Sequence, residues 1–295
     1  MIVSASYRTD IPALYGTWFI NRLRAGFCMV TNPYNRRPMR VSLAPADVQG
    51  IVFWTRNIGP LLAHLDEVRD RGFPFVVLYT ICGYARPLDR HVIPAERALE
   101  HAHELALRFG PRVCVWRYDP IVFSSLTPAS FHVDNFSRLA GALRGATDEV
   151  VISFAQFYAK SIRNMNAAAR EGGFTWSDPS DAAKRKLARQ LLPAARDAGM
   201  TLSICAQRQY LVEGAADARC IDAARLSDVA GRPIVAAGRG HRPAQCACVA
   251  SRDIGAYNTC PQGCAYCYAV AGVESARRNL RRHDPAGDFL LPPLR

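Results

Sequence analysis

Six short apolar segments, each followed by a helical pattern, most constrain how this chain can fold. We predict strands at residues 2–6, 51–55, 75–79, 113–116, 150–154 and 201–205. Helices are predicted near residues 14–26, 60–72, 94–109, 128–145 and 180–198, with a further helix near 273–283. Leu61, Leu62, Leu65 and Val68, for example, recur at helical spacing. Strands that alternate with helices predict an α/β fold whose parallel sheet has helices outside it.

Polar residues follow nearly every predicted strand, so we expect a partial or closed (β/α) barrel. In such barrels the chemistry lies at the C-terminal ends of the strands. An open, doubly wound sheet is the alternative architecture. The candidate catalytic residues at these ends are Arg8, Asp10, Arg117, Asp119 and Gln156.

Two of these positions combine an arginine with a carboxylate. Arg117 and Asp119 could clamp a substrate or hold each other as a structural ion pair, and Arg8 with Asp10 repeats the pattern. Arg208, after the sixth predicted strand, is a candidate contact to a cofactor.

The alternation stops near residue 206, which predicts two parts. Residues 1–205 would form the barrel-like domain, and residues 206–295 a C-terminal cysteine-rich lobe that binds an iron–sulfur cluster and packs on the barrel rim. The chain has 295 residues, of which 49% are hydrophobic, so it can bury a substantial core.

The motif Cys260-Pro-Gln-Gly-Cys264-Ala-Tyr-Cys267 places three thiols in one short loop. An iron–sulfur cluster normally takes four cysteines, so three can hold one cluster and leave a corner open for a small molecule. A structural zinc loop is the alternative. Zinc usually takes paired C-x2-C units, and only Cys264 and Cys267 form one.

Four more cysteines lie in the second half of the chain, namely Cys205, Cys220, Cys246 and Cys248. Four thiolates suffice for a closed iron–sulfur cluster or a tetrahedral zinc site, so we predict a second metal site here. The alternative is that Cys205 and Cys220 are ordinary buried thiols.

The net charge of +12 permits an anionic partner such as nucleic acid, although charge alone does not establish one. No apolar run approaches membrane-spanning length, and the first residues lack the pattern of a secretion signal. We therefore expect a cytoplasmic protein without a membrane partner. The ten cysteines then indicate metal binding or catalysis rather than disulfides.

Four segments give the chain a resemblance to an uncharacterised bacterial family, domain of unknown function 1848. They are Ser4-Ala-Ser-Tyr-Arg-Thr-Asp-Ile-Pro12, Gly50-Ile-Val-Phe-Trp-Thr-Arg-Asn57, Arg117-Tyr-Asp-Pro120, and Asp253-Ile-Gly-Ala-Tyr-Asn-Thr-Cys260 with its following loop. Together they span the chain nearly end to end.

The three-cysteine motif resembles that of radical S-adenosylmethionine (SAM) enzymes, in which an aromatic residue commonly precedes the third cysteine, as Tyr266 does. Its continuation is similar to that of the spore photoproduct lyases. The resemblance implies that Cys260, Cys264 and Cys267 hold a [4Fe-4S] cluster whose open iron binds the amino and carboxylate groups of SAM. Tyr266, in the motif, and Arg208, at its strand end, are the candidate cofactor contacts. A reductant such as flavodoxin or ferredoxin would supply an electron to cleave SAM and start radical chemistry. The substrate is unknown, and nucleic acid is one candidate.

This chain departs from that superfamily in two respects. The cysteine motif comes last instead of following the first barrel strand, and no clear Gly-Gly-Glu segment is present for the methionine amine. Two other functions are therefore considered. One is a non-catalytic zinc or iron–sulfur protein that binds nucleic acid, and the other is an iron–sulfur redox protein that does not use SAM.

Overall fold

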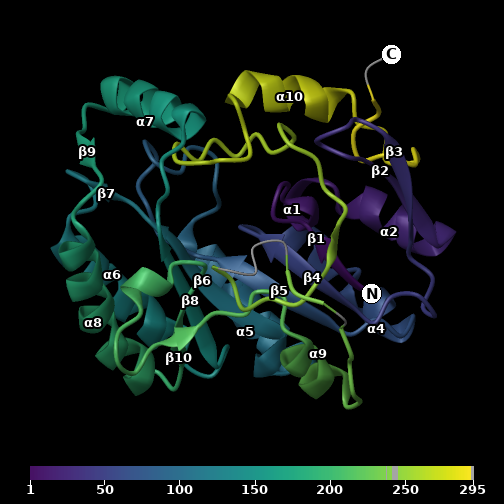
Figure 1. The fold of residues 1–295 in the computed structure, drawn as a ribbon, viewed down its shortest axis with the longest axis horizontal. Coiled ribbons are helices and arrows are strands. Elements are labelled where there is room, and N and C mark those ends of the chain that lie inside the picture. The colour runs from purple at the N-terminus through teal and green to yellow at the C-terminus, as the bar shows by residue number, and fades with distance from the viewer. Residues whose placement is uncertain (237, 241–244, 294–295) are drawn as a thin grey trace.

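A central sheet of eight parallel strands organises the protein (Figure 1). The computed structural model describes residues 1–236, 238–240 and 245–293. The six predicted strands are confirmed as β1 (Ile2–Ala5), β4 (Gly50–Thr55), β5 (Phe75–Thr80), β6 (Cys114–Ile121), β8 (Glu149–Phe154) and β10 (Thr201–Ile204). Two short strands, β11 (Ala216–Asp217) and β12 (Arg252–Asp253), complete the sheet.

The strand order is β11-β10-β8-β6-β5-β4-β1-β12, so the six long strands neighbour one another in chain order. A doubly wound sheet would reverse its order among the long strands, which this sheet does not do, although the last strand, β12, lies on the other side of β1. The order is that of a barrel wall. Among the described residues, however, the pairings end at β11 and β12 and do not close the sheet into a barrel.

Four of the longer helices pack on one face of the sheet, namely α2 (Gly16–Ala25), α5 (Ala95–Phe109), α6 (Ala129–Ala142) and α8 (Asp181–Asp197). The predicted helix near 60–72 is divided into α3 (Gly59–Leu62) and α4 (Leu65–Asp70), and the one near 14–26 begins with the short α1 (Ile11–Leu14). Neither these nor any other described helix is both long and apolar enough to cross a membrane.

Several elements were not predicted. They are the hairpin β2 (Phe27–Thr31) and β3 (Pro38–Ser42), the small pair β7 (Phe123–Ser124) and β9 (Trp176–Ser177), and the helices α7 (Ala159–Gly172) and α9 (Ala223–Ala230). The last helix, α10 (Val273–Arg281), lies where a helix was predicted. The predicted metal-binding part, residues 206–295, contributes β11 and β12 to the same sheet. Residues 237, 241–244 and 294–295 of this part are outside the residues that the structure describes.

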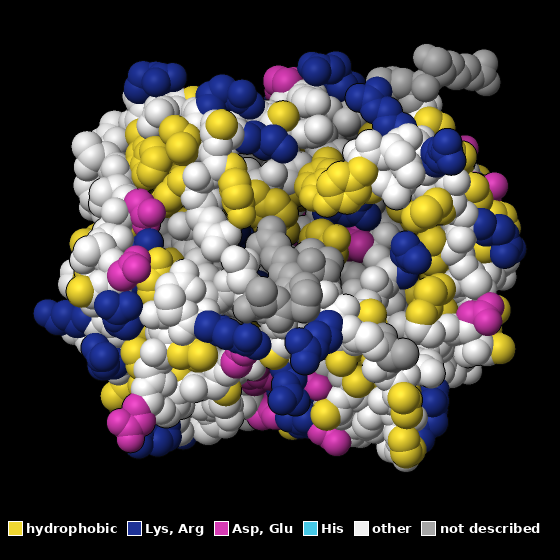
Figure 2. All heavy atoms as spheres, viewed as in Figure 1, with side chains coloured by type: hydrophobic (Ala, Val, Ile, Leu, Met, Phe, Trp, Pro, Cys, Tyr) yellow, Lys and Arg dark blue, Asp and Glu magenta, His cyan; other side chains and the backbone are white. Residues whose placement is uncertain are grey.

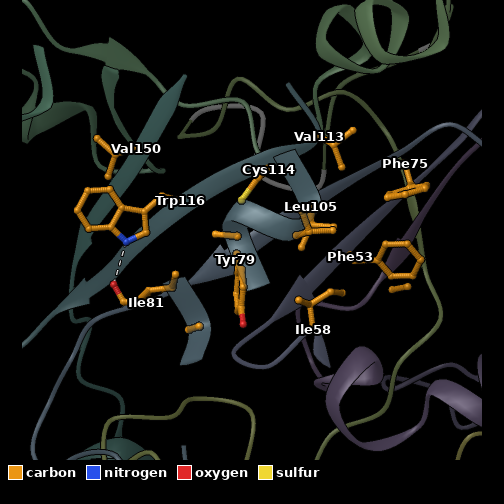
Figure 3. Packing of buried hydrophobic residues seen from close by; sticks show 14 of the residues in the cluster. Phe53, Ile58, Phe75, Tyr79, Ile81, Leu105, Val113, Cys114, Trp116 and Val150 are labelled. Carbon is orange, nitrogen blue, oxygen red and sulfur yellow. Dashed lines mark hydrogen bonds between the residues drawn. The ribbon is translucent and has the colours of Figure 1, made fainter. Parts of the chain in front are cut away.

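Both faces of the sheet are buried, which explains why its strands are continuous apolar runs. On the helix side, Phe53, Phe75, Tyr79 and Trp116 pack in the main core, and Trp116 Nε1 donates to the Ile81 carbonyl at 2.9 Å (Figure 3). On the other side, Val52, Val76, Val115 and Val151 pack against Ala218, Ile221 and Leu226 from the segment around α9. Side chains that follow these valines on the same face, Trp54 and Arg117 among them, therefore lie near the carboxyl edge beneath the C-terminal part of the chain.

Candidate functional site

The loop of Cys260, Cys264 and Cys267, here called the cysteine loop, lies against the carboxyl edge of the sheet. Pairing of β12 with β1 brings the chain to this edge. There Gln262 Nε2 donates to Asp10 at 2.6 Å, and Arg56 NH1 lies 3.5 Å from Cys264 Sγ. Figure 1 shows the segment before α10 running across towards α7, and Lys160 and Asn164 of α7 donate to carbonyl oxygens of residues 268 and 270. The loop thus occupies the edge where catalytic groups were expected.

The three thiols of the loop are close enough to interact electrostatically with one another. Burial raises the pKa of all three above the ordinary value of a cysteine. Backbone N–H groups oppose this effect, and that of Ala269 donates to Cys267 Sγ at 3.4 Å. Such thiols are protonated at neutral pH, and a bound metal would displace their protons.

A buried polar network supports the loop from the sheet side. Arg56 pairs with Asp89 at 2.6 Å and also donates to the Tyr266 hydroxyl. Tyr266 in turn donates to Asp89 at 2.7 Å. The predicted cofactor contact Tyr266 is therefore a buried side chain held by an ion pair. A cavity of about 220 Å³, lined in part by Arg56, Cys82 and Asp89, adjoins this network.

Asp10 is buried at the start of α1, where it accepts from the backbone N–H of Ala13. It also accepts from Thr55 Oγ1 at 2.6 Å and from the backbone N–H of Arg56 at 2.8 Å. Burial raises the pKa of Asp10 to about 6, although these hydrogen bonds act in the opposite direction. The aspartate therefore couples strand ends β1 and β4 to the cysteine loop.

One prediction was that Arg8 and Asp10 form an ion pair with each other, and they do not: Arg8 pairs with another carboxylate. Its guanidinium lies 2.8 Å from Asp253, and both side chains are buried. Asp253 also accepts from Ser4 Oγ at 3.0 Å and Ser6 Oγ at 2.7 Å. Arg8 is thus part of the junction that fixes β12 beside β1.

Arg117 and Asp119 do hold each other in an ion pair, as one of their two interpretations predicted. Ser153 donates to the same carboxylate. The Arg117 guanidinium lies 4.9 Å from the ring centroid of Trp54, and its NH1 lies 2.9 Å from Cys220 Sγ. Arg117 therefore links the carboxyl edge of β6 to a second set of cysteines.

That second set, Cys205, Cys220, Cys246 and Cys248, is here called the four-cysteine group. Cys205 Sγ and Cys220 Sγ are 3.4 Å apart. The thiol of Cys248 interacts with those of Cys220 and Cys246, so the four are joined in one chain of contacts. Hydrogen bonds from Cys205 and Cys248, together with Arg117, lower the pKa of Cys220 well below its usual value.

Neither cysteine set is a ready-made metal centre. Within the part of the chain that the structure describes, no group of three or more Cys, His, Asp or Glu side chains is arranged so that it could hold a metal ion. Metal binding at either set would need the sulfurs to turn towards a common centre.

The other predicted residues lie further from the loop. Gln156 is exposed after β8 and accepts from the Tyr158 hydroxyl at 2.9 Å. Arg208 is exposed and pairs at 2.7 Å with Asp217. Because Asp217 acts electrostatically on Cys246, Arg208 is associated with the four-cysteine group and not with the cysteine loop.

Sequence reasoning did not select Arg56, Asp89 or Asp253 as site residues. Arg56 and Asp253 lie within the segments that carry the family resemblance, which is a signal that could have found them. Asp89 follows no strand and belongs to no motif. Only the fold reveals that it meets the loop, where it forms an isolated β-bridge with Cys264.

The chain was also compared with known proteins. No curated protein and no solved structure matches it. A family model described as "Domain of unknown function (DUF1848)" matches residues 2–269, which include both cysteine sets and the ion pairs at the carboxyl edge. The chain therefore belongs to the DUF1848 family.

Proposed function

We propose that the protein is an iron–sulfur enzyme of the radical SAM type, with Cys260, Cys264 and Cys267 as the ligands of a [4Fe-4S] cluster. The observation that carries this proposal is the position of the cysteine loop. It lies at the carboxyl edge of strands arranged in chain order, which is where barrel-like enzymes place their chemistry. With SAM bound, such a cluster would supply the electron for reductive SAM cleavage.

The residues around the loop suit this assignment. Three thiolates carry negative charge that needs compensation in a buried site, and Arg56 is directed at Cys264 from 3.5 Å. The N–H group of Ala269 donates to Cys267, and hydrogen bonds of this kind tune iron–sulfur centres. The three cysteines are only partly exposed, and limited access of water would protect a radical reaction from side reactions.

The rim side chains would position the substrate. Arg117 and Asp119 offer a donor and an acceptor on the inner face of the sheet, beside Trp54. Tyr268 lies between the two regions, because it interacts electrostatically with both Cys267 and Arg117. Asp10 would hold the loop through Gln262, and Arg8 would fix β12, so both are positioning residues in this proposal.

The proposed partners are an anionic substrate and a small reductant protein such as flavodoxin or ferredoxin. Nucleic acid stays a candidate substrate because of the charge of +12. Figure 2 shows Lys and Arg side chains spread around the visible face rather than gathered in one patch. This distribution favours a small anionic ligand over a long nucleic acid track on that face.

The test is anaerobic reconstitution with iron and sulfide. We expect about four irons per chain, and their loss when Cys260, Cys264 and Cys267 are changed to alanine. Cys28→Ala is the matched control, since Cys28 is a buried thiol in β2.

SAM cleavage is then measured with a strong reductant. Zinc without iron in the reconstituted protein would contradict the proposal and support the zinc-binding alternative. Iron without SAM cleavage would support the redox alternative.

A further inference from the structure

We propose that the four-cysteine group binds one zinc ion through Cys205, Cys220, Cys246 and Cys248, as a structural site separate from the cysteine loop. The four residues come from three places in the chain. Cys205 directly follows β10, Cys220 follows β11, and Cys246 with Cys248 precedes β12. One ion would therefore join β10, the last long strand, to the two segments that cover the face of the sheet opposite the main core.

The sulfur spacing favours a single ion. Four thiolates at about 2.3 Å from a tetrahedral zinc lie about 3.8 Å from one another. Cys205 Sγ and Cys220 Sγ are 3.4 Å apart, so this pair is close to that spacing, and the sulfurs of Cys246 and Cys248 would turn towards it on binding. A disulfide would need about 2.0 Å. A [4Fe-4S] cluster gives each cysteine its own iron, which places the sulfurs further apart.

The surroundings supply what a zinc tetrathiolate needs. Such a centre carries two negative charges, and the buried Arg117 donates to Cys220 Sγ at 2.9 Å. The backbone N–H of Ile221 donates to Cys248 Sγ at 3.3 Å, and that of Cys248 to Cys246 Sγ at 3.4 Å. These contacts orient the ligands in the way outer hydrogen bonds do in known metal sites.

The segment around the group explains why an ion would be useful. Among the described residues of 206–250, the regular elements are a 3-10 turn at Arg208–Tyr210, the two-residue strand β11 and the helix α9. A segment with few periodic apolar faces gains little from packing, and metal-binding energy can replace part of that stabilisation.

The test uses the full chain with Cys260, Cys264 and Cys267 changed to alanine, so that the cysteine loop cannot bind metal. We expect Co²⁺ to bind with one equivalent per chain, to give the visible absorption of a tetrahedral thiolate complex, and to be displaced by Zn²⁺. Cys220→Ser or Cys248→Ser should abolish this absorption, whereas Cys28→Ser should not. Arg117→Gln should weaken Zn²⁺ binding by about 10-fold or more.

A second measurement needs no ligand variant. The otherwise native chain is alkylated with and without Zn²⁺, and the modified cysteines are identified by mass spectrometry. Protection of all four residues by one equivalent of zinc supports the site. Equal alkylation of Cys205 and Cys248 in both samples overturns it, as does a Cys205–Cys220 disulfide that forms at the same rate with zinc present. Because the readout is zinc at these four residues, its failure is distinct from a failure to load iron at the cysteine loop.

Discussion

Replacing Asp253 by alanine should destabilise the protein more than any exposed ion-pair variant. The carboxylate receives the Arg8 guanidinium at 2.8 Å and hydrogen bonds from Ser4, Ser6, and the backbone N–H groups of Tyr7 and Gly255. Both charged side chains are only 5–6% exposed. Removing one partner of a buried pair costs about 3–5 kcal/mol, because the other charge is left in a site without water.

The expected loss is therefore about 4 kcal/mol, which corresponds to about 8 °C in Tm for a chain of this length. The assay is thermal unfolding followed by circular dichroism. Glu67→Ala is the matched control, since Glu67 pairs with Arg24 at 2.6 Å on the surface, where such a pair contributes under about 1 kcal/mol. If Asp253→Ala lowers Tm no more than Glu67→Ala does, the junction of β12 with β1 does not have the role argued above.

Three further outcomes are expected. His132 Nε2 donates to the Val122 carbonyl, Nδ1 shares a hydrogen bond with the Tyr118 hydroxyl, and burial lowers the pKa of His132 to about 4. The unfolded chain then binds a proton near pH 6.5 that the folded chain does not, so between pH 7 and pH 5 this group should lower the free energy of unfolding by about 2 kcal/mol. Buried Asp10, with a pKa of about 6, acts in the opposite direction over this range, so the native chain is compared with His132→Gln in denaturant titrations: it should lose about 2 kcal/mol more than the variant, and equal changes would contradict this. Gly255→Ala should lower the free energy of unfolding by about 1–3 kcal/mol, because an added Cβ would lie 2.1 Å from Ser6 Oγ. Gly272→Ala is the control and should change Tm little, since no atom lies within 4 Å of its added Cβ; equal changes in Tm would contradict this prediction. Chelation of zinc should lower the Tm of the otherwise native chain but not of Cys248→Ser, and an equal decrease in both would show that the chelator acts elsewhere.

The sheet could be predicted from sequence because each long strand is a continuous apolar run. Phe75–Thr80 is buried on both faces, so its pattern is unambiguous, and Pro94 and Gly110 mark the two ends of α5. The hairpin β2–β3 and helix α7 were missed because few of their residues are fully buried, so their hydrophobic residues show only a weak periodicity.

The candidate site was harder to predict, because its partners are distant in sequence. The residue types at the strand ends were foreseen, but not that Arg8 would pair with Asp253 or Arg56 with Asp89. A motif shows which side chains carry chemistry, whereas an ion pair between distant segments depends on the path of the chain between them. The sequence allowed Cys205 and Cys220 to be either metal ligands that lie together or separate buried thiols, because the two roles have the same sequence pattern. In the structure the two sulfurs are in contact.

The strand order also determines when the cysteine loop can be assembled. Val3 in the first strand pairs with Arg252, which is synthesised only after all six long strands. Contacts between such distant segments form late, because the intervening chain must first be ordered. Until then the open edge of β1 is exposed, and Asp10 and Arg56 have no loop to hold. The cysteine loop therefore takes its place last, after the sheet that supports it has folded.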